Sequence, residues 1–313
     1  MYNLAEQNFG ETAQISSVAL FDTSTYYNWI NEVRTYMTTE RNKITYFVVD
    51  DDYFNSEYNT LRPYYHTHYN EMGNVPPDST TSFFTKKALL RDFIVLGEED
   101  LGNAVTDLIS VSGTKFTVDT ADIISRHKAS NGIVYRVRKL SVEITDRIKE
   151  IKVLGASPVG YRQNDKRGNT FFRDKRDTLG NLYSDLEVYD HKVTSFYVKY
   201  RASNANSIRY KVYGRGILGL AGDPQTAAFT QNVYFFNPAA VSTVEVNLYN
   251  KPVVNSTGAN AAFMPWAVTM LNHDEVYLGE VVQDEFGALP FLVMCAGTGP
   301  IIIEYLRFVP VIQ

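Results

Sequence analysis

The sequence predicts two domains, an α+β N-terminal domain followed by an all-β sandwich of the jelly-roll kind. The first half mixes apolar stretches at helical spacing with short β-branched runs. From Leu186 onward, about eight short alternating runs follow one another, separated by turn residues, as in sandwiches and jelly rolls. A chain of 313 residues is also long for one domain. We therefore predict a lead-in arm (1–15), an α+β domain (16–150), a linker with a basic hairpin (151–180) and a sandwich (181–313).

The spacing of apolar residues predicts the helices and strands of the first domain. Apolar residues three and four apart predict a helix over 23–36, and the run Ile44–Val49 predicts a buried strand. The three aspartates at 50–52 read as an acidic helix start, because the Asp-x-Asp-x-Asp-Gly spacing of a calcium loop is absent. A second helix is expected over 83–95 and ends before Gly97.

One tight turn closes this domain. Asn131-Gly132 favours a hairpin, because both residues tolerate positive φ. The alternating run from Ile133 to Leu140 then predicts a strand that leaves the turn.

Three stretches, in this order, resemble the fasciclin-like domain. A Thr-x-Phe-x-Pro-x-Asp-x-x-Phe pattern is matched, with valine in place of proline, by Thr45, Phe47, Val49, Asp51 and Phe54. A Leu-Leu-x-Tyr-His-Val-like stretch before glycine corresponds to 89–97, and an Asn-Gly turn with an apolar strand corresponds to 131–140. The resemblance covers about residues 15–145 and implies an α+β module with a role in adhesion. Asp92 and Phe93 stand where the family has Tyr-His, so integrin-type recognition is not expected.

Within the second half, three features have competing interpretations. The basic stretch 162–177 is either an anion or partner contact or a solvated hairpin, and its interleaved acids favour the hairpin. Gly214, Gly216 and Gly219 fit a dinucleotide-binding pattern literally, but no long helix follows, so we expect a strand end. The single cysteine, Cys295, lies in an apolar run and is expected as a buried strand thiol.

Composition and motifs argue against several function classes. The net charge of −5 gives no electrostatic footprint for nucleic acid. No stretch of 18 apolar residues predicts a membrane span, and no metal, cofactor or catalytic motif is complete, including His66 and His68. We expect no enzyme and no cofactor. A hydrolase that uses sandwich carboxylates stays open as an alternative, with these candidates: Glu187, Asp190, Asp274, Glu275, Glu280 and Glu304.

Sugar binding needs an exposed aromatic face beside polar groups. Trp266 is the first candidate glycan contact, with packed core as its alternative, and Tyr197 and Tyr213 are the others because they alternate with core-facing positions.

The two-domain architecture resembles surface lipoproteins of Bacteroidetes that accompany SusC/SusD-type uptake systems. The resemblance implies a polysaccharide ligand, a transporter partner, an outer-membrane location and a lipid anchor upstream of residue 1. A purely structural assembly subunit is the remaining alternative.

Overall fold

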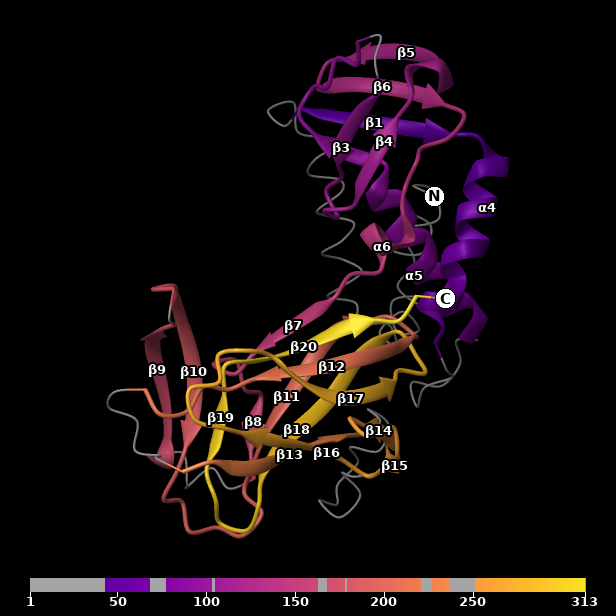
Figure 1. Ribbon diagram of the computed structural model, residues 1–313. Helices are drawn as coiled ribbons and strands as arrows, with labels where there is room; N and C mark the ends of the chain where they lie inside the picture. Colours follow the sequence, from indigo (N-terminus) through magenta and orange to yellow (C-terminus); the bar gives the residue numbers. More distant parts are fainter. Residues whose placement is uncertain are drawn as a thin grey trace, which may run out of the picture. The chain divides into compact units, whose positions relative to one another are not determined.

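The structure, a computed structural model, describes residues 43–67, 77–102, 105–162, 168–177, 179–220, 227–236 and 251–312. The chain forms two compact units, Met1–Arg147 and Ile148–Gln313, drawn from indigo through magenta to yellow in Figure 1. The predicted arm (1–15) and the predicted helix over 23–36 lie outside the described residues.

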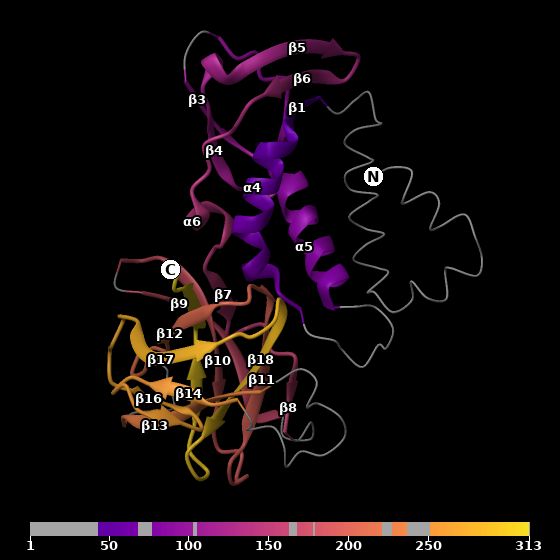
Figure 2. The same cartoon turned by 90° about the vertical axis from the view of Figure 1, so that its right-hand side faces the viewer.

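The first unit is built on a four-stranded sheet in the order β2-β1-β6-β5. Its strands are β1 (Ile44–Val49), β2 (Ile94–Leu96), β5 (Ile123–Ala129) and β6 (Gly132–Val137). Strands β1 and β6 are parallel, and the other neighbours are antiparallel. Two helices, α4 (Asp51–Leu61) and α5 (Pro77–Asp92), lie side by side beneath the sheet in Figure 2. The smaller elements are η1 (Arg62–Tyr65), β3 (Thr106–Ile109), β4 (Lys115–Val118), η2 (Thr120–Asp122) and α6 (Ile144–Arg147).

The predicted elements of this unit are largely confirmed. Strand β1 has the predicted bounds, and helix α4 begins with two acids, Asp51 and Asp52, in its first turn. The second helix differs from the prediction, because α5 ends at Asp92 and residues 94–96 pair with β1 instead. The β-branched Ile94 and Val95 favour that strand and bury their side chains in it.

The Asn131-Gly132 turn joins β5 to β6, as predicted. Gly132 has a further constraint, because a Cβ at this position would lie 1.8 Å from the carbonyl oxygen of Ile44 on the parallel neighbour. Glycine is therefore required both by the turn and by the close approach of β1.

Asp92 is an internal anchor of the first unit. Its Oδ2 lies 2.9 Å from Nε of Arg147, and its Oδ1 accepts a hydrogen bond of 2.6 Å from the Ser112 hydroxyl. Burial raises the pKa of the Asp92 carboxyl, and the Arg147 charge opposes that shift. Asp92 therefore holds the end of α5 against α6.

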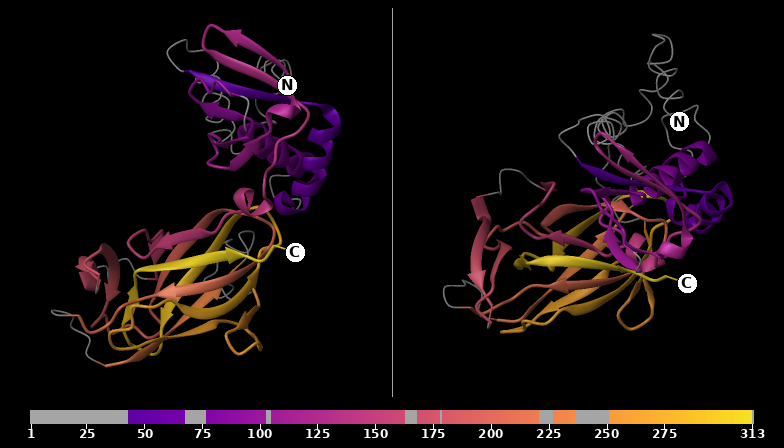
Figure 3. Two further views of the ribbon diagram at one scale, coloured as in Figure 1. Left: turned by 45° about the horizontal axis from the view of Figure 1, so that its top comes forward. Right: turned by 90° about the horizontal axis from the view of Figure 1, so that it is seen from above.

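The second unit is a two-sheet sandwich (Figure 3). The five-stranded sheet has the order β16-β13-β18-β11-β8, and the six-stranded sheet has the order β15-β14-β17-β12-β20-β7. The first sheet comprises β8 (Gly160–Tyr161), β11 (Tyr197–Ala205), β13 (Phe229–Phe235), β16 (Met264–Val268) and β18 (Gly287–Cys295). The second comprises β7 (Ile151–Leu154), β12 (Arg209–Arg215), β14 (Val253–Asn255), β15 (Asn260–Ala261), β17 (Val276–Val282) and β20 (Tyr305–Pro310).

The core of the sandwich joins the two sheets. The rings of Phe235 and Phe291, from the five-stranded sheet, lie 6.1 and 5.4 Å from the ring of Phe308, from the six-stranded sheet. Cys295 is buried at the end of β18, as predicted. The all-β sandwich predicted for the second half is thus present.

Residues 151–180 are not a linker. They supply β7 and β8 to the two sheets and β9 (Thr170–Arg176) to a third sheet. This three-stranded sheet has the order β19-β10-β9, with β10 (Leu182–Val188) and β19 (Ile301–Ile303). Within the basic stretch 162–177, the described strand β9 forms one arm of a hairpin with β10. The expected solvated hairpin is corrected in one respect, because Lys175 is mostly buried with carboxylates of β10 around its ammonium group.

Candidate functional site

The outer face of the six-stranded sheet carries a row of aromatic and basic side chains. Strand register places Tyr277, Tyr213, Arg307 and Lys152 side by side on β17, β12, β20 and β7. Directly paired residues of antiparallel strands point to the same side. Their chain neighbours, such as Gly214 and Phe308, face the core, so this row faces outward. We call these four residues the tyrosine–cation row, and Figure 1 shows the four strands as neighbours.

A β-bulge brings the two tyrosines of the row together. The register of β12 against β17 shifts between Val212 and Tyr213, so that Tyr213 pairs with Tyr277. Their ring centroids lie 5.4 Å apart at an angle of 52°. Both tyrosines are half-buried, so each is supported from below and still meets solvent.

Arg307 is fixed beside Tyr213. Its guanidinium carbon lies 4.9 Å from the centre of the Tyr213 ring. Nε donates to Glu275 Oε1 at 2.7 Å, Nη2 donates to the other Glu275 oxygen, and Nη1 donates to Glu150 Oε2 at 2.8 Å. Such a bidentate pair fixes the guanidinium geometrically. The hydrogen bonds from Arg307 lower the pKa of the Glu275 carboxyl, and the same contact raises the pKa of Arg307.

Lys152 ends the row in a similar arrangement. Its ammonium nitrogen lies 3.6 Å from the ring centre of Tyr305, which is itself largely buried. Burial, followed by the neighbouring Glu275, raises the pKa of the Tyr305 hydroxyl to about 12, so it keeps its proton at neutral pH. Neighbouring strands lie about 4.8 Å apart, so three strand intervals give the row a length of roughly 14 Å.

Of the three sequence-predicted contacts, only Tyr213 reaches this face. Trp266 is 1% exposed in the sandwich core, with its indole against Gly214 and Gly216. Its prediction as a glycan contact is therefore corrected to its stated alternative, packed core. The glycines at 214 and 216 leave room for that ring and lie at the end of β12, which agrees with the strand-end interpretation.

Tyr197 is also buried. It lies on the opposite side of its strand from the core-facing residues, as expected, but only 2% of it is exposed, among Phe236, Leu292 and Met294. An outward position in the alternation does not guarantee exposure, because a second apolar cluster forms on that side of the five-stranded sheet.

The candidate hydrolytic carboxylates are mostly paired with cations. Glu187 contacts Lys175 and Arg173, and Glu304 lies 2.9 Å from Arg215. The remaining pairs are Glu275 with Arg307, Glu280 with Arg209, and Asp190 with Lys192, while Asp274 is exposed. Burial raises the pKa of Glu304, and Arg215 opposes this shift.

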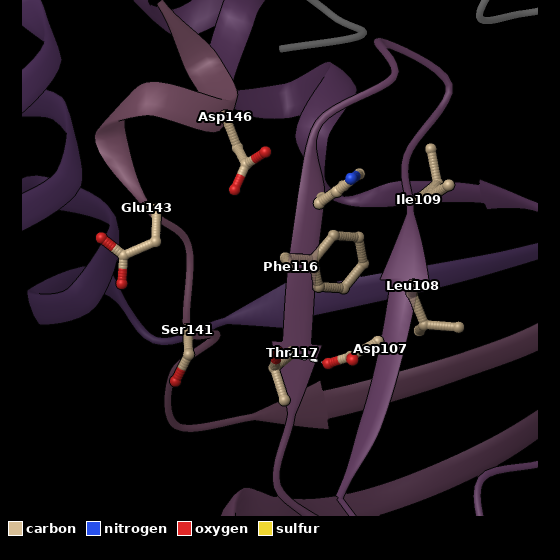
Figure 4. Close-up of a pocket in the computed structure, with 9 residues that line it drawn as sticks. Asp107, Leu108, Ile109, Phe116, Thr117, Ser141, Glu143 and Asp146 are labelled. Carbon is tan, nitrogen blue, oxygen red and sulfur yellow. Dashed lines mark hydrogen bonds between the residues drawn. The ribbon is translucent and has the colours of Figure 1, made fainter.

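A pocket of about 480 Å³ lies in the first unit, on the β3–β4 hairpin (Figure 4). Phe116, Asp107, Glu143 and Asp146 are among the residues that line it, and Figure 4 draws them as sticks. Asp107 accepts a hydrogen bond of 2.7 Å from Thr117, and both Asp107 and Glu143 are exposed.

Within the described ranges, no group of three or more histidine, cysteine, aspartate or glutamate side chains could hold a metal ion. His66 follows η1, and His68 lies outside the described residues. Among the helices that the structure describes, none is both long and apolar enough to cross a membrane.

No protein-family model matches the chain, and no curated protein matches it. Solved structures give distant partial likenesses. A GH26-CBM35 β-(1,4)-mannanase of Podospora anserina is 12% identical, with a TM-score of 0.33 over 53% of this chain and 28% of that one. The carbohydrate-binding module TmCBM27, studied for mannan recognition, is 11% identical, with a TM-score of 0.21 over 52% and 99%. The insecticidal crystal protein Cry2Aa is 14% identical, with a TM-score of 0.28 over 56% and 24%. At these scores the likenesses carry no inference about the ligand.

Proposed function

We propose that the second unit is a non-enzymatic carbohydrate-binding module, and that its contact surface is the tyrosine–cation row. The observation that carries this proposal is the pair of half-buried tyrosine rings with Arg307 fixed beside them. Sugar rings present C–H faces that pack on aromatic rings, while their hydroxyls need polar partners at the edge. Tyr213 and Tyr277 supply the rings, and Arg307, Glu275 and Lys152 supply the polar groups.

The row is prepared for binding before a ligand arrives. Arg307 is held by two carboxylates and one ring, so little side-chain freedom remains to be lost on binding. A length of roughly 14 Å also suits a short stretch of a polysaccharide better than a single sugar, since three strand intervals separate its ends.

The disposition of the carboxylates supports binding rather than hydrolysis. Glycoside hydrolysis needs a proton-donating acid and a free carboxylate on either side of the scissile bond. Beside the row, Glu275 accepts hydrogen bonds from Arg307, and these hydrogen bonds lower the pKa of its carboxyl. A hydrolase remains the alternative, and release of reducing ends from a bound polysaccharide would establish it.

The wider setting belongs to the same proposal. A fasciclin-like first domain is supported by the motif residues Thr45, Phe47, Asp51 and Phe54 and by the α+β arrangement around them. The further role, as a lipid-anchored surface protein beside an uptake complex, is supported only by the architectural resemblance. Co-purification of the natively expressed protein with a transporter would test it, and a protein recovered without lipid or partner would contradict it.

The binding proposal is tested by a glycan array probed with the full chain and with the double variant Tyr213→Ala/Tyr277→Ala. We expect the wild type to bind a subset of polysaccharides and the double variant to lose those signals while it keeps its thermal unfolding transition. Equal signals from both proteins, or no glycan bound by the wild type, would contradict the proposal.

A further inference from the structure

The β9–β10 hairpin places two cations and two carboxylates on one of its faces. Arg173 and Lys175 alternate along β9, and Asp185 and Glu187 alternate along β10. Register pairs Arg173 with Asp185 and Lys175 with Tyr183, so Lys175 stands diagonally across from Asp185. Long side chains reach such diagonal neighbours.

This cluster is buried to an unusual degree for charged groups. The side chain of Lys175 is 9% exposed, and those of Asp185 and Glu187 are 0% and 2% exposed. Lys175 Nζ lies 3.0 Å from Asp185 Oδ2 and also contacts Glu187 Oε1. An amine and two carboxyl groups are thus held together away from water, where charged forms are costly and a proton moves readily between partners.

The two carboxyl groups have different surroundings. Glu187 has a second cation, because Arg173 Nε lies 2.9 Å from its Oε2, and Arg173 is itself held by the Tyr189 hydroxyl at 3.1 Å. Glu187 therefore lies between two cations and touches the Lys175 ammonium group, the position that a proton relay requires. Asp185 is the more deeply buried of the two, and its Oδ2 lies 3.0 Å from Lys175 Nζ.

We propose that Lys175 and Asp185 condense to form an intramolecular amide, with Glu187 as the proton relay. The ammonium group of Lys175 loses a proton, which passes by way of Glu187 to the Asp185 carboxylate. The neutral amine then attacks Asp185 Cγ, and an N–C bond forms. Glu187 carries the second amine proton to the departing oxygen, the C–O bond breaks, and one water leaves. The overall change converts an ammonium and a carboxylate into an amide and water, with no oxidant or activated co-reactant.

The product would relieve the burial of two charges and tie the hairpin together. An amide is neutral, so the desolvation cost of the ion pair disappears. A covalent link between β9 and β10 also restricts the unfolded chain, as any cross-link does. This inference concerns the third sheet and is independent of the proposed glycan binding.

Intact mass spectrometry of the full chain tests the proposal directly. We expect the wild-type protein to be lighter than its sequence mass by one water, and digestion to yield a branched peptide that joins the Lys175 and Asp185 segments. A wild-type protein at its full sequence mass would overturn the proposal, and so would a branched peptide that links Lys175 to Glu187.

Three variants sharpen the test. Lys175→Arg keeps a cation but cannot form the amide, so its mass should equal its sequence mass. Glu187→Gln should also stay at its sequence mass while it remains folded by circular dichroism, because the relay is removed. Lys192→Arg is the matched control, since Lys192 also contacts an aspartate, Asp190, but both are exposed. It should lose one water like the wild type, and a full sequence mass in this control would contradict the assignment.

Discussion

The two faces of the six-stranded sheet differ in whether the aromatic side chains against them are exposed to solvent or buried. Tyr213 and Gly214 are neighbours on β12, yet one points outward and the other inward. On the outer face, Tyr213 is half-buried beside Tyr277 and Arg307. On the inner face, Gly214 has no side chain, and the indole of Trp266 fills that space. Aromatic residues are thus ligand candidates only where the strand alternation and the local packing both leave them in contact with solvent.

The largest expected loss of stability comes from a substitution on the inner face. Trp266→Ala removes a fully buried indole and leaves a cavity that the neighbouring glycines cannot fill, so we expect a loss of about 3–5 kcal/mol in the free energy of unfolding. Chemical denaturation of the full chain measures this loss. A loss below about 1 kcal/mol would show that the indole is not part of the core, and would restore it as a possible surface contact.

The next largest loss of stability is expected at Gly214, which lies against that indole. A Cβ at position 214 would lie 2.9 Å from Cε2 and Cζ2 of Trp266 and 3.1 Å from Cδ1 of Leu278. Gly214→Ala should therefore cost about 1–3 kcal/mol of stability through overpacking. Gly160→Ala is the control, because there the nearest atom, Lys199 Cδ, lies 3.7 Å from the added carbon. Equal losses from both substitutions would argue against close packing at Gly214.

The outer face should contribute little to stability, and its contribution should depend on pH. Hydrogen bonds from Arg307 lower the pKa of Glu275 below its ordinary value of 4.5. A lowered carboxyl pKa stabilises the folded state above the ordinary value, and this stabilisation is lost as the pH falls through the lowered one. For a partly exposed pair we expect at most about 1 kcal/mol.

Thermal unfolding of the wild type and of Glu275→Gln from pH 7 down to acid checks this sign. The wild type should be the more stable at neutral pH, and the gap should close below pH 4.5. A gap that widens on acidification would contradict the contact between Glu275 and Arg307.

Much of the fold follows from local patterns in the sequence. The strand at 44–49, the acidic start of α4, the Asn131-Gly132 hairpin and the alternating strands of the second half all express local propensity and period. The sequence of segment 151–180 predicts a linker because β7 and β8 are short and pair with strands distant in the sequence, β20 and β11. Pairing between remote strands leaves little local signal.

The candidate site was only partly predictable. Alternation placed Tyr213 outward, but Tyr197 obeys the same rule and is buried by a second apolar cluster. Tyr277, Arg307 and Lys152 come from strands far apart in the sequence and meet Tyr213 only through register and a bulge. The sequence offers one local hint of this bulge. Gly279 follows Leu278 shortly after Tyr277, and glycine within a strand often marks a bulge.

The central claim is that the outer face of the six-stranded sheet binds glycan, and one affinity comparison tests it most directly. Isothermal titration with the best polysaccharide from the array compares wild type, Tyr213→Ala and Tyr58→Ala. Tyr58 is a matched control, since it is a half-buried tyrosine of the first unit with Lys86 Nζ 5.9 Å from its ring centre. We expect Tyr213→Ala to weaken binding about tenfold, the factor that corresponds to a ring contact of about 1.4 kcal/mol, and Tyr58→Ala to bind like the wild type. Unchanged affinity in Tyr213→Ala, or an equal loss in both variants, would contradict the claim.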